Sequence, residues 1–370
     1  MKSNKSFVVL IPLVLFLFWL GLRTNSSTKT VYYPTEEKHH GICWVGGREI
    51  VTQDELQKAA DLGVNWISQT PFGWQRGHDN PSIGNQIGST QGWWGERDEG
   101  LRATTKMAKQ LGIKTILKPH IWLRDEAGKW RGEIQMKSEE DWLSWFKNYE
   151  TFILHYAQLA EEENIEMLCI GTELHRTCVE REMDWRQLIA KIRTVYSGQL
   201  TYAANFADEY EEVAFWDQLD MIGIQGYFPV STKENPSVEE VKKGWEQHIV
   251  QLEAFSNRYQ KPILFTEIGY KSTKDSGIEP WQWPQRLPYE EREALQSEET
   301  QANLYEGMFA SLYNKDFIAG FHLWKWFPYY EERIQRFRER YPEQQYVDID
   351  FTPQGKQAEA VISKWYTADQ

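Results

Sequence analysis

The sequence contains few cysteines, which limits the kinds of site it can build. Its 370 residues include only Cys43, Cys169 and Cys178, which lack the spacing of zinc ligands and leave at least one thiol without a disulfide partner. Cys43 and Cys169 lie in apolar, strand-like runs, so we expect buried and inert thiols. The sequence therefore gives no sign of a zinc site or a disulfide framework.

Basic residues are also scarce relative to acidic ones. The chain has 41 Lys and Arg residues against 54 Asp and Glu, and the net charge of −13 is spread without a dominant run. A surface of this sign repels nucleic acid, and no basic stripe compensates for it, so we expect no nucleic-acid partner. The 41% hydrophobic and 14% aromatic content instead predicts a large folded core.

Long apolar runs are limited to one, at residues 7–22, which follows two lysines. It is longer than most signal-peptide cores and shorter than the roughly 20 residues of a spanning helix. We interpret it as an export signal, either cleaved or retained as a membrane anchor, and the lack of a small-x-small cleavage site after Leu22 favours the anchor. We therefore expect residues 1–37 to be a signal or anchor with a linker. Residues 38–370 would form an exported domain at the cell surface or in the periplasm.

Short β-rich runs alternate with longer amphipathic segments over the rest of the chain. The strand-like runs begin at residues 41, 64, 113, 166, 200, 220, 262 and 317. Helical periodicity occurs between them, for example over residues 52–63, 100–112 and 140–164. Eight strand-then-helix units predict an α/β fold, a (β/α)8 TIM barrel with enlarged loops after its strands.

Half of the 18 tryptophans lie in or beside these predicted loops, at residues 71–95, 121–137, 271–296 and 325–350. In a (β/α)8 barrel, the loops after the strands build the active face. Indole rings offer flat apolar surfaces for stacking on a ligand. The pattern predicts a ligand site with aromatic platforms, built from Trp74, Trp93, Trp94, Trp122, Trp130, Trp281, Trp283, Trp324 and Trp326.

Two glutamates end otherwise apolar strands. Glu173 follows the predicted fourth strand and Glu267 ends the seventh, so both would point into the mouth of the barrel. For either glutamate alone, an ion pair with Lys118, His120 or Arg176 would explain its position. Two carboxylates flanking a glycosidic bond are what its hydrolysis requires, and the pair among stacking residues predicts a glycoside hydrolase.

Five segments carry a family resemblance: "TILKPHIW", "LCIGTELH", "IGIQGYFP", "LFTEIGY" and "GFHLWKW". Over residues 41 to about 365, the chain resembles the clan A glycoside hydrolases, which are retaining (β/α)8 enzymes. It is most similar to family 113, whose characterised members are mainly β-mannanases. The resemblance implies Glu173 as acid/base and Glu267 as nucleophile. It also implies that Tyr227 donates a hydrogen bond to the nucleophile and that Trp324 lies under the sugar of the cleaved subsite.

One position departs from the clan. Many members carry Asn before the acid/base, where it contacts the sugar 2-hydroxyl, whereas this chain has Thr172. We therefore expect His120 or Asn205 to recognise the axial 2-hydroxyl of a neutral β-1,4-linked mannan or manno-oligosaccharide. The further candidates for substrate contact are Lys118, Trp74, Trp94 and Trp122.

Three other functions stay open at this point. A metal-dependent barrel hydrolase could use His120, His175 and His322, although the first strand offers no His-x-His pair. A barrel of this kind could also bind glycans without cleaving them, or hydrolyse another β-glycan. We expect a monomer with a glycan substrate and no metal or cofactor, of the endo-β-1,4-mannanase or β-mannosidase type. Internal cleavage, end trimming and sugar transfer are not distinguished.

Overall fold

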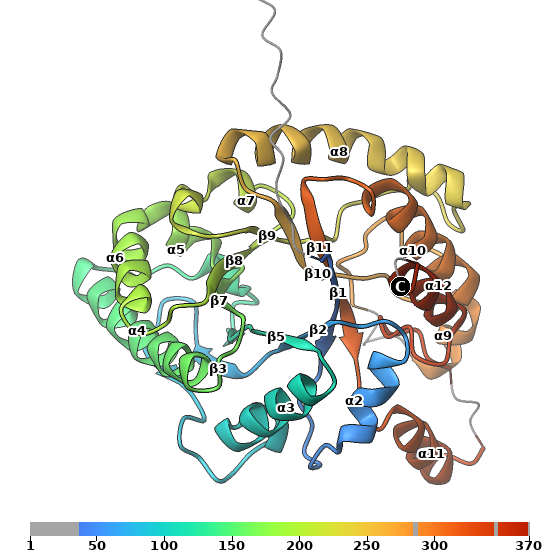
Figure 1. The fold of residues 1–370 in the computed structure, drawn as a ribbon, viewed down its shortest axis with the longest axis horizontal. Coiled ribbons are helices and arrows are strands. Elements are labelled where there is room, and N and C mark those ends of the chain that lie inside the picture. Colours follow the sequence, from blue (N-terminus) through green and yellow to red (C-terminus); the bar gives the residue numbers. More distant parts are fainter. Residues whose placement is uncertain (1–36, 284–287, 344–346, 369–370) are drawn as a thin grey trace, which may run out of the picture. The chain divides into compact units, whose positions relative to one another are not determined.

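Eight parallel strands form a closed barrel at the centre of the molecule (Figure 1). The computed structural model describes residues 37–283, 288–343 and 347–368. The strands follow one another around the barrel in the order β1-β11-β10-β9-β8-β7-β5-β2. All eight predicted strands are present, which confirms the TIM barrel. Their bounds are β1 (His39–Trp44), β2 (Trp66–Gln69), β5 (Lys114–Leu117), β7 (Met167–Thr172), β8 (Gln199–Asn205), β9 (Ile222–Gln225), β10 (Ile263–Ile268) and β11 (Ile318–Trp326).

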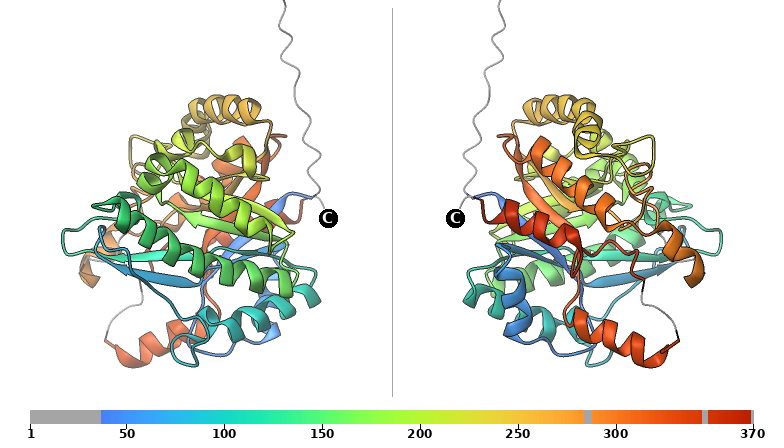
Figure 2. Two further views of the ribbon diagram at one scale, coloured as in Figure 1. Left: turned by 90° about the vertical axis from the view of Figure 1, so that its left-hand side faces the viewer. Right: turned by 90° about the vertical axis from the view of Figure 1, so that its right-hand side faces the viewer.

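Helices surround the barrel on its outside (Figures 1 and 2). Two of the joints from helix to strand use glycines, Gly63 with φ +84° and Gly112 with φ +73°, a conformation that other residues rarely adopt. The helices are α2 (Gln53–Ala60), α3 (Asp98–Gln110), α4 (Glu139–Glu162), α5 (His175–Glu180), α6 (Glu182–Arg193), α7 (Glu209–Glu212), α8 (Val238–Tyr259), α9 (Tyr289–Leu295), α10 (Glu298–Leu312), α11 (Tyr330–Arg340) and α12 (Gln357–Tyr366). Short 3-10 turns occur at Trp94–Glu96, Arg131–Glu133 and Trp216–Gln218.

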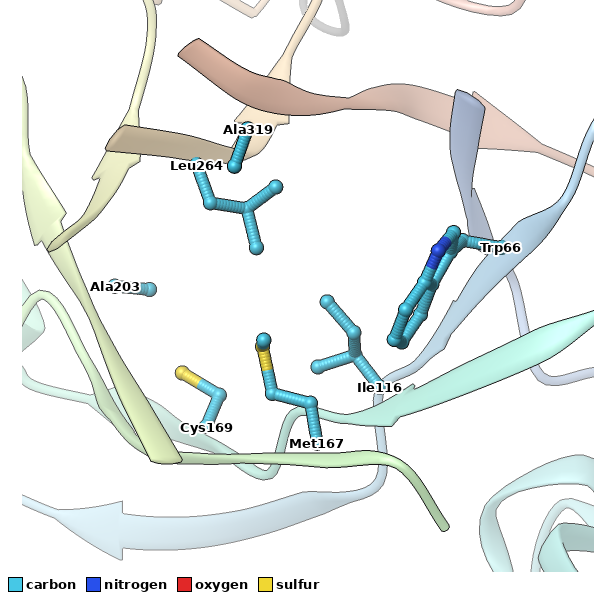
Figure 3. Close-up of a cluster of buried hydrophobic side chains, with 7 residues drawn as sticks. All are labelled: Trp66, Ile116, Met167, Cys169, Ala203, Leu264 and Ala319. Atoms are coloured by element: carbon cyan, nitrogen blue, oxygen red, sulfur yellow. The ribbon is translucent and has the colours of Figure 1, made fainter. Parts of the chain in front are cut away.

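Alternate strand residues point into the barrel and fill it. Figure 3 shows side chains from six strands meeting in the interior: Trp66, Ile116, Met167, Cys169, Ala203, Leu264 and Ala319. Each is at most 4% exposed, so the interior is a packed core and not a pore. All three cysteines are buried free thiols, which confirms the predicted burial of Cys43 and Cys169.

A polar layer shares this interior. His39, on β1, stacks on Trp66 with ring centroids 3.8 Å apart, and its Nδ1 lies 3.3 Å from Nε2 of His322 on β11. Ser68 Oγ lies 2.8 Å from the other ring nitrogen of His322. Burial lowers the pKa of His39 to about 3 and keeps the pKa of His322 well below its usual range, so both rings are neutral.

A small second sheet, absent from the sequence prediction, extends two barrel strands beyond the rim. It pairs β3 (Phe72–Arg76) with β4 (Ile83–Gly84) and with β6 (His120–Arg124). Pro71 precedes β3 and Pro119 precedes β6. Because proline has no N–H to donate to the ladder of the barrel, β2 and β5 end before these residues. The third strand was predicted to continue to residue 120. The structure divides this run at Lys118 and Pro119.

No helix among the described residues is both long and apolar enough to cross a membrane. The predicted signal or anchor at residues 7–22 lies outside them.

Candidate active site

Glu267 sits near the carboxyl end of β10 and is 7% exposed. Three side chains donate to its carboxylate. The Tyr227 hydroxyl lies 2.5 Å from Oε1, and Oε2 accepts from Gln225 Nε2 at 3.0 Å and Lys118 Nζ at 3.1 Å. A carboxylate that only accepts hydrogen bonds suits this ring of donors, because an added proton would oppose one of them. These three donors fix the position of the Glu267 carboxylate.

Lys118 lies beneath Glu267 with no exposed surface. Its ammonium also donates to the Thr266 carbonyl at 2.9 Å. Burial alone would lower the pKa of Lys118, but nearby negative charge, including that of Glu267, outweighs it and leaves the pKa raised. The side chain expected to contact a sugar hydroxyl is therefore buried as the charge partner of Glu267.

Glu173 follows β7 and has an unusual backbone. Its φ of +51° is in the left-handed region, which costs a non-glycine residue on the order of 1–3 kcal/mol. Backbone hydrogen bonds hold it there: Glu173 N donates to the Ala203 carbonyl at 2.9 Å, and Leu174 N donates to the Tyr202 hydroxyl at 2.7 Å. The turn ends the strand and directs the glutamate side chain away from the strand's ladder.

The Glu173 carboxyl is 12% exposed and meets two partners. Asn205 Nδ2 donates to Oε1 at 2.8 Å, and Arg131 Nε lies 3.6 Å from Oε2. Burial raises the pKa of Glu173, Arg131 opposes the rise, and the charge of Glu267 adds to it. A raised pKa is what a carboxyl needs if it is to hold a proton for donation.

His120 shares Arg131 with Glu173. Arg131 donates from a terminal guanidinium nitrogen to His120 Nδ1 at 3.2 Å, so the ring proton lies on Nε2. Burial holds the pKa of His120 well below its usual range, so the ring is neutral. Its Nε2 is buried and has no hydrogen-bond partner in the described structure. A buried donor without a partner calls for an explanation, such as an acceptor supplied by a ligand.

The second sheet presents an aromatic face beside these residues. Trp74 on β3 pairs in register with Trp122 on β6, two residues beyond the pairing of Phe72 with His120. The alternate residues of β3 face the other way. Gly73 abuts Phe152 and Gln75 accepts a hydrogen bond from Trp145, and both aromatic residues lie on α4. Trp74 and Trp122 therefore share the face that carries His120, away from α4. Trp122 is 56% exposed.

Two other predicted platforms differ from each other. Trp324 on β11 is half-buried, and its ring meets that of Trp283 edge-on at 6.3 Å, while its indole nitrogen has no partner among the described atoms. Trp94 is only 4% exposed, so little of its ring is open for stacking. The backbone at Trp94 packs closely against α3, since a Cβ at Gly100 would lie 1.9 Å from the Trp94 carbonyl.

Four residues that the sequence did not suggest complete the site. They are Arg131, Gln225, Tyr202 and Glu209, and each supports one of the two carboxylates directly or through a neighbour. Gln225 shares a strand face with Tyr227, so strand alternation could have identified it. The other three make contacts between separate elements, from the 3-10 turn at Arg131, from β8 and from α7, and the sequence carries no local signal for such contacts.

The histidines of the metal alternative do not converge. His322 lies in the barrel interior beside His39, His120 contacts Arg131, and His175 pairs with Glu212 at 2.6 Å. Over the described ranges, no group of three His, Cys, Asp or Glu side chains could hold a metal ion.

Known proteins resemble this chain in sequence and fold. The model of Glycoside Hydrolase Family 113 matches residues 48–347. The GH113 β-mannanase AaManA from Alicyclobacillus acidocaldarius, in complex with ManMIm, is 27% identical, covers 90% of this chain with 99% of its own, and gives a TM-score of 0.74. A complex structure of a GH113 β-1,4-mannanase is 26% identical, with coverages of 90% and 100% and a TM-score of 0.72.

More distant likeness extends to the fold alone. A β-glucuronidase from Ruminococcus gnavus, in complex with C6-substituted uronic isofagomine, is 12% identical and gives a TM-score of 0.56. It matches 89% of this chain and 50% of its own. No curated protein matches the sequence.

Proposed function

The chain belongs to glycoside hydrolase family 113, and from this premise we propose that it cleaves β-1,4-linked mannan or manno-oligosaccharides with retention of anomeric configuration. It is a glycoside hydrolase; the substrate and the stereochemistry are the proposal. The observation that carries the mechanism is the contrast between two glutamates, one surrounded by donors and the other with a raised pKa.

Glu267 is the proposed nucleophile. Its carboxylate attacks the anomeric carbon and forms a covalent glycosyl-enzyme, while the glycosidic oxygen leaves with a proton from Glu173. Lys118 and Gln225 hold Oε2 and Tyr227 holds Oε1, so the attacking group needs little reorganisation. Water then hydrolyses the intermediate, with Glu173 now acting as the base.

Glu173 is the proposed acid/base. A general acid must hold its proton at the working pH, and burial of the Glu173 carboxyl favours this state. Asn205 orients Oε1, which leaves Oε2 beside Arg131. Mutual repulsion supports the division of roles, because the charge on Glu267 disfavours a second charge on Glu173.

Two observations favour mannose. The family relatives named above are β-mannanases, and the site offers a donor for a hydroxyl group in His120 Nε2. Asn205 is the weaker candidate for the axial 2-hydroxyl, because its amide already donates to Glu173 and accepts from Ala207 N at 3.0 Å. We therefore assign the 2-hydroxyl contact to His120.

The stereochemistry is tested by proton NMR of the first product formed from a β-manno-oligosaccharide. Retention gives the β-anomer initially, and the carboxyl groups should lie about 5 Å apart in a substrate complex. An initial α-anomer would rule out Glu267 as nucleophile.

The substrate is tested by comparing kcat/KM on manno- and cello-oligosaccharides of equal length. A site that hydrogen-bonds the axial hydroxyl should prefer the manno series strongly, because the gluco series leaves its buried polar groups unpaired. Equal rates would refute the mannan assignment and leave the retaining mechanism intact. A protein that binds both series without turnover would be a glycan-binding barrel.

A further inference from the structure

Glu209 is a buried carboxyl outside the pair of glutamates described above. It begins α7, in the connection between β8 and β9, and is 1% exposed. Oε1 accepts from the Tyr202 hydroxyl at 2.5 Å, and Oε2 accepts from Asn205 N at 2.7 Å. No cation in the described part of the chain pairs with it directly, so its burial is unfavourable unless the two hydrogen bonds serve a purpose.

Both of its partners lead to Glu173. The Tyr202 hydroxyl, which donates to Glu209, also accepts from Leu174 N at 2.7 Å, immediately after Glu173 in the chain. Asn205, whose backbone N–H is held by Glu209, donates its side-chain amide to Glu173 Oε1 at 2.8 Å. One carboxyl therefore controls both the backbone after Glu173 and the partner of its side chain.

The backbone of Glu173 needs such support. Its φ of +51° persists only where the surroundings fix it, since a glutamate in the left-handed region is strained. Ala203, on the same strand as Tyr202, accepts the hydrogen bond from Glu173 N. The support for this turn thus comes from the end of β8, and Glu209 holds that end in place by accepting hydrogen bonds from Tyr202 and Asn205.

The charged and titratable groups around Glu209 are few. Burial raises the pKa of Glu209 to about 8, its bonds from Tyr202 and Asn205 lower it, and the charge of Glu173 raises it further, with Arg131 opposing. Cys178 on α5 also faces it, with its thiol protonated because burial holds its pKa well above the usual range. Glu209 is buried and its hydrogen bonds go to Tyr202 and Asn205, so its effect on the site passes through these two neighbours.

We propose that Glu209 and Tyr202 are positioning residues that hold Glu173 in its left-handed turn and aim its carboxyl at the leaving-group oxygen. This inference rests on the proposed role of Glu173 as acid/base. It predicts that damage to the Glu209 and Tyr202 contacts impairs protonation of the leaving group, and spares the attack by Glu267.

The test uses Glu209→Gln and Tyr202→Phe, which keep side-chain volume and remove one or both hydrogen bonds. Each should lower kcat/KM on a manno-oligosaccharide by roughly 10- to 100-fold, part of the 10²- to 10⁴-fold that acid catalysis supplies. An aryl manno-oligosaccharide with a dinitrophenolate leaving group needs no proton, so its kcat/KM should change less than about threefold. Tyr196→Phe is the matched control, because its buried hydroxyl donates to the Ile165 carbonyl just before the other end of β7.

Glu173→Ala separates this inference from the proposed function. If Glu173 is the acid, Glu173→Ala spares the dinitrophenyl substrate at the step of bond cleavage, and adding Tyr202→Phe or Glu209→Gln to it causes no further loss on the oligosaccharide. If Glu173→Ala has equal effects on both substrates, the proposed function fails. If Glu173→Ala behaves as expected but Tyr202→Phe and Glu209→Gln slow both substrates equally, or match Tyr196→Phe, the inference alone is overturned.

Discussion

At the scale of single residues, the two glutamates differ in the cation that each one meets. Glu267 lies 3.1 Å from the ammonium of Lys118. The Lys118 side chain is fully buried, and its ammonium also donates to the Thr266 carbonyl. Glu173 meets the Arg131 guanidinium at 3.6 Å, and that side chain is 25% exposed. The nearer and drier contact fixes the Glu267 carboxylate in place. The longer and wetter contact is weaker, and it leaves the pKa of Glu173 raised.

Arg131 provides a test of this difference. Its charge lowers the pKa of Glu173 against the rise caused by burial, so Arg131→Gln should raise that pKa further. An acid with a higher pKa keeps its proton to higher pH, and the alkaline limb of the kcat/KM profile should therefore move to higher pH. The profile measured on a manno-oligosaccharide checks the direction.

Arg102→Gln is the control for this profile, because Arg102 pairs with Glu162 and Glu163 outside the described site. Its alkaline limb should stay in place. A limb that moves to lower pH in Arg131→Gln would contradict the assignment of Glu173 as the titrating acid.

Sequence reasoning identified some of these residues and missed others for a physical reason. Strand alternation and the family resemblance led to the expected hydrogen bond from Tyr227 to Glu267, and the structure contains it. Lys118 was expected among the substrate contacts. Its burial under Glu267 could not be read from the sequence, because it depends on how neighbouring strands pack. Arg131 enters from a loop, and a loop's endpoint in space is not encoded by local periodicity.

At the scale of elements, the barrel strands were predictable because each is a short apolar run followed by an amphipathic helix. The sheet of β3, β4 and β6 was not predicted, because its strands lie in segments that read as loops. Its inner face alternates Gly73 and Gln75 against α4, and its outer face carries Trp74 and Trp122. A two-residue alternation over five residues is too short to separate a strand from an irregular loop.

The outer face of this sheet should bind sugar units beyond the cleaved one. Trp122→Ala should raise KM for a long manno-oligosaccharide roughly 3- to 10-fold, equivalent to about 0.5–1.5 kcal/mol for one aromatic contact. The kcat on the shortest cleaved substrate should be unchanged, because Trp122 does not touch either glutamate in the described contacts. Steady-state kinetics over a series of chain lengths provides the measurement.

Val250→Ala is the matched surface control, since Val250 is 68% exposed on α8. It should leave KM unchanged at every chain length. If Trp122→Ala had the same KM as the unmodified enzyme on the longest oligosaccharide, the sheet would have no part in binding.

At the scale of the whole molecule, buried neutral histidines predict acid sensitivity. An unfolded histidine takes up a proton near pH 6.5, whereas folded His39 does so only near pH 3 and His322 well below 6.5. Between these values the unfolded state binds more protons, so the free energy of unfolding falls as pH falls from about 6.5 towards 3. At pH 5 the loss is on the order of 2 kcal/mol for His39, and His322 contributes in the same direction.

Urea denaturation at pH 7 and pH 5 measures this loss. His39→Phe removes one titrating group and preserves a ring against Trp66, so the difference in unfolding free energy between the two pH values should shrink by about the contribution of one histidine. An unchanged difference in His39→Phe would show that His39 is not among the groups responsible.

Deletion of residues 1–37 tests the predicted division of the chain. The barrel begins at His39, and Lys38 Nζ hydrogen-bonds to the carbonyls of Lys315 and Ile318, so the shortened protein retains every described barrel strand. We expect it to keep the kcat/KM of the full chain, whereas the full chain should fractionate outside the cytoplasm, on membranes if the anchor is retained. Full-length protein in the soluble cytoplasmic fraction of its host would contradict this location.

The direction of β1 has a practical consequence for display of the protein on a support. His39 lies at the amino end of a parallel barrel, while Glu173 and Glu267 lie at the carboxyl ends of their strands. A bead, a surface or a fusion partner attached ahead of residue 38 would therefore join the face opposite the carboxylates. Immobilisation through this end should leave the face with the two carboxylates open to large polysaccharides. Attachment near α5 should place the support in front of that face and obstruct them.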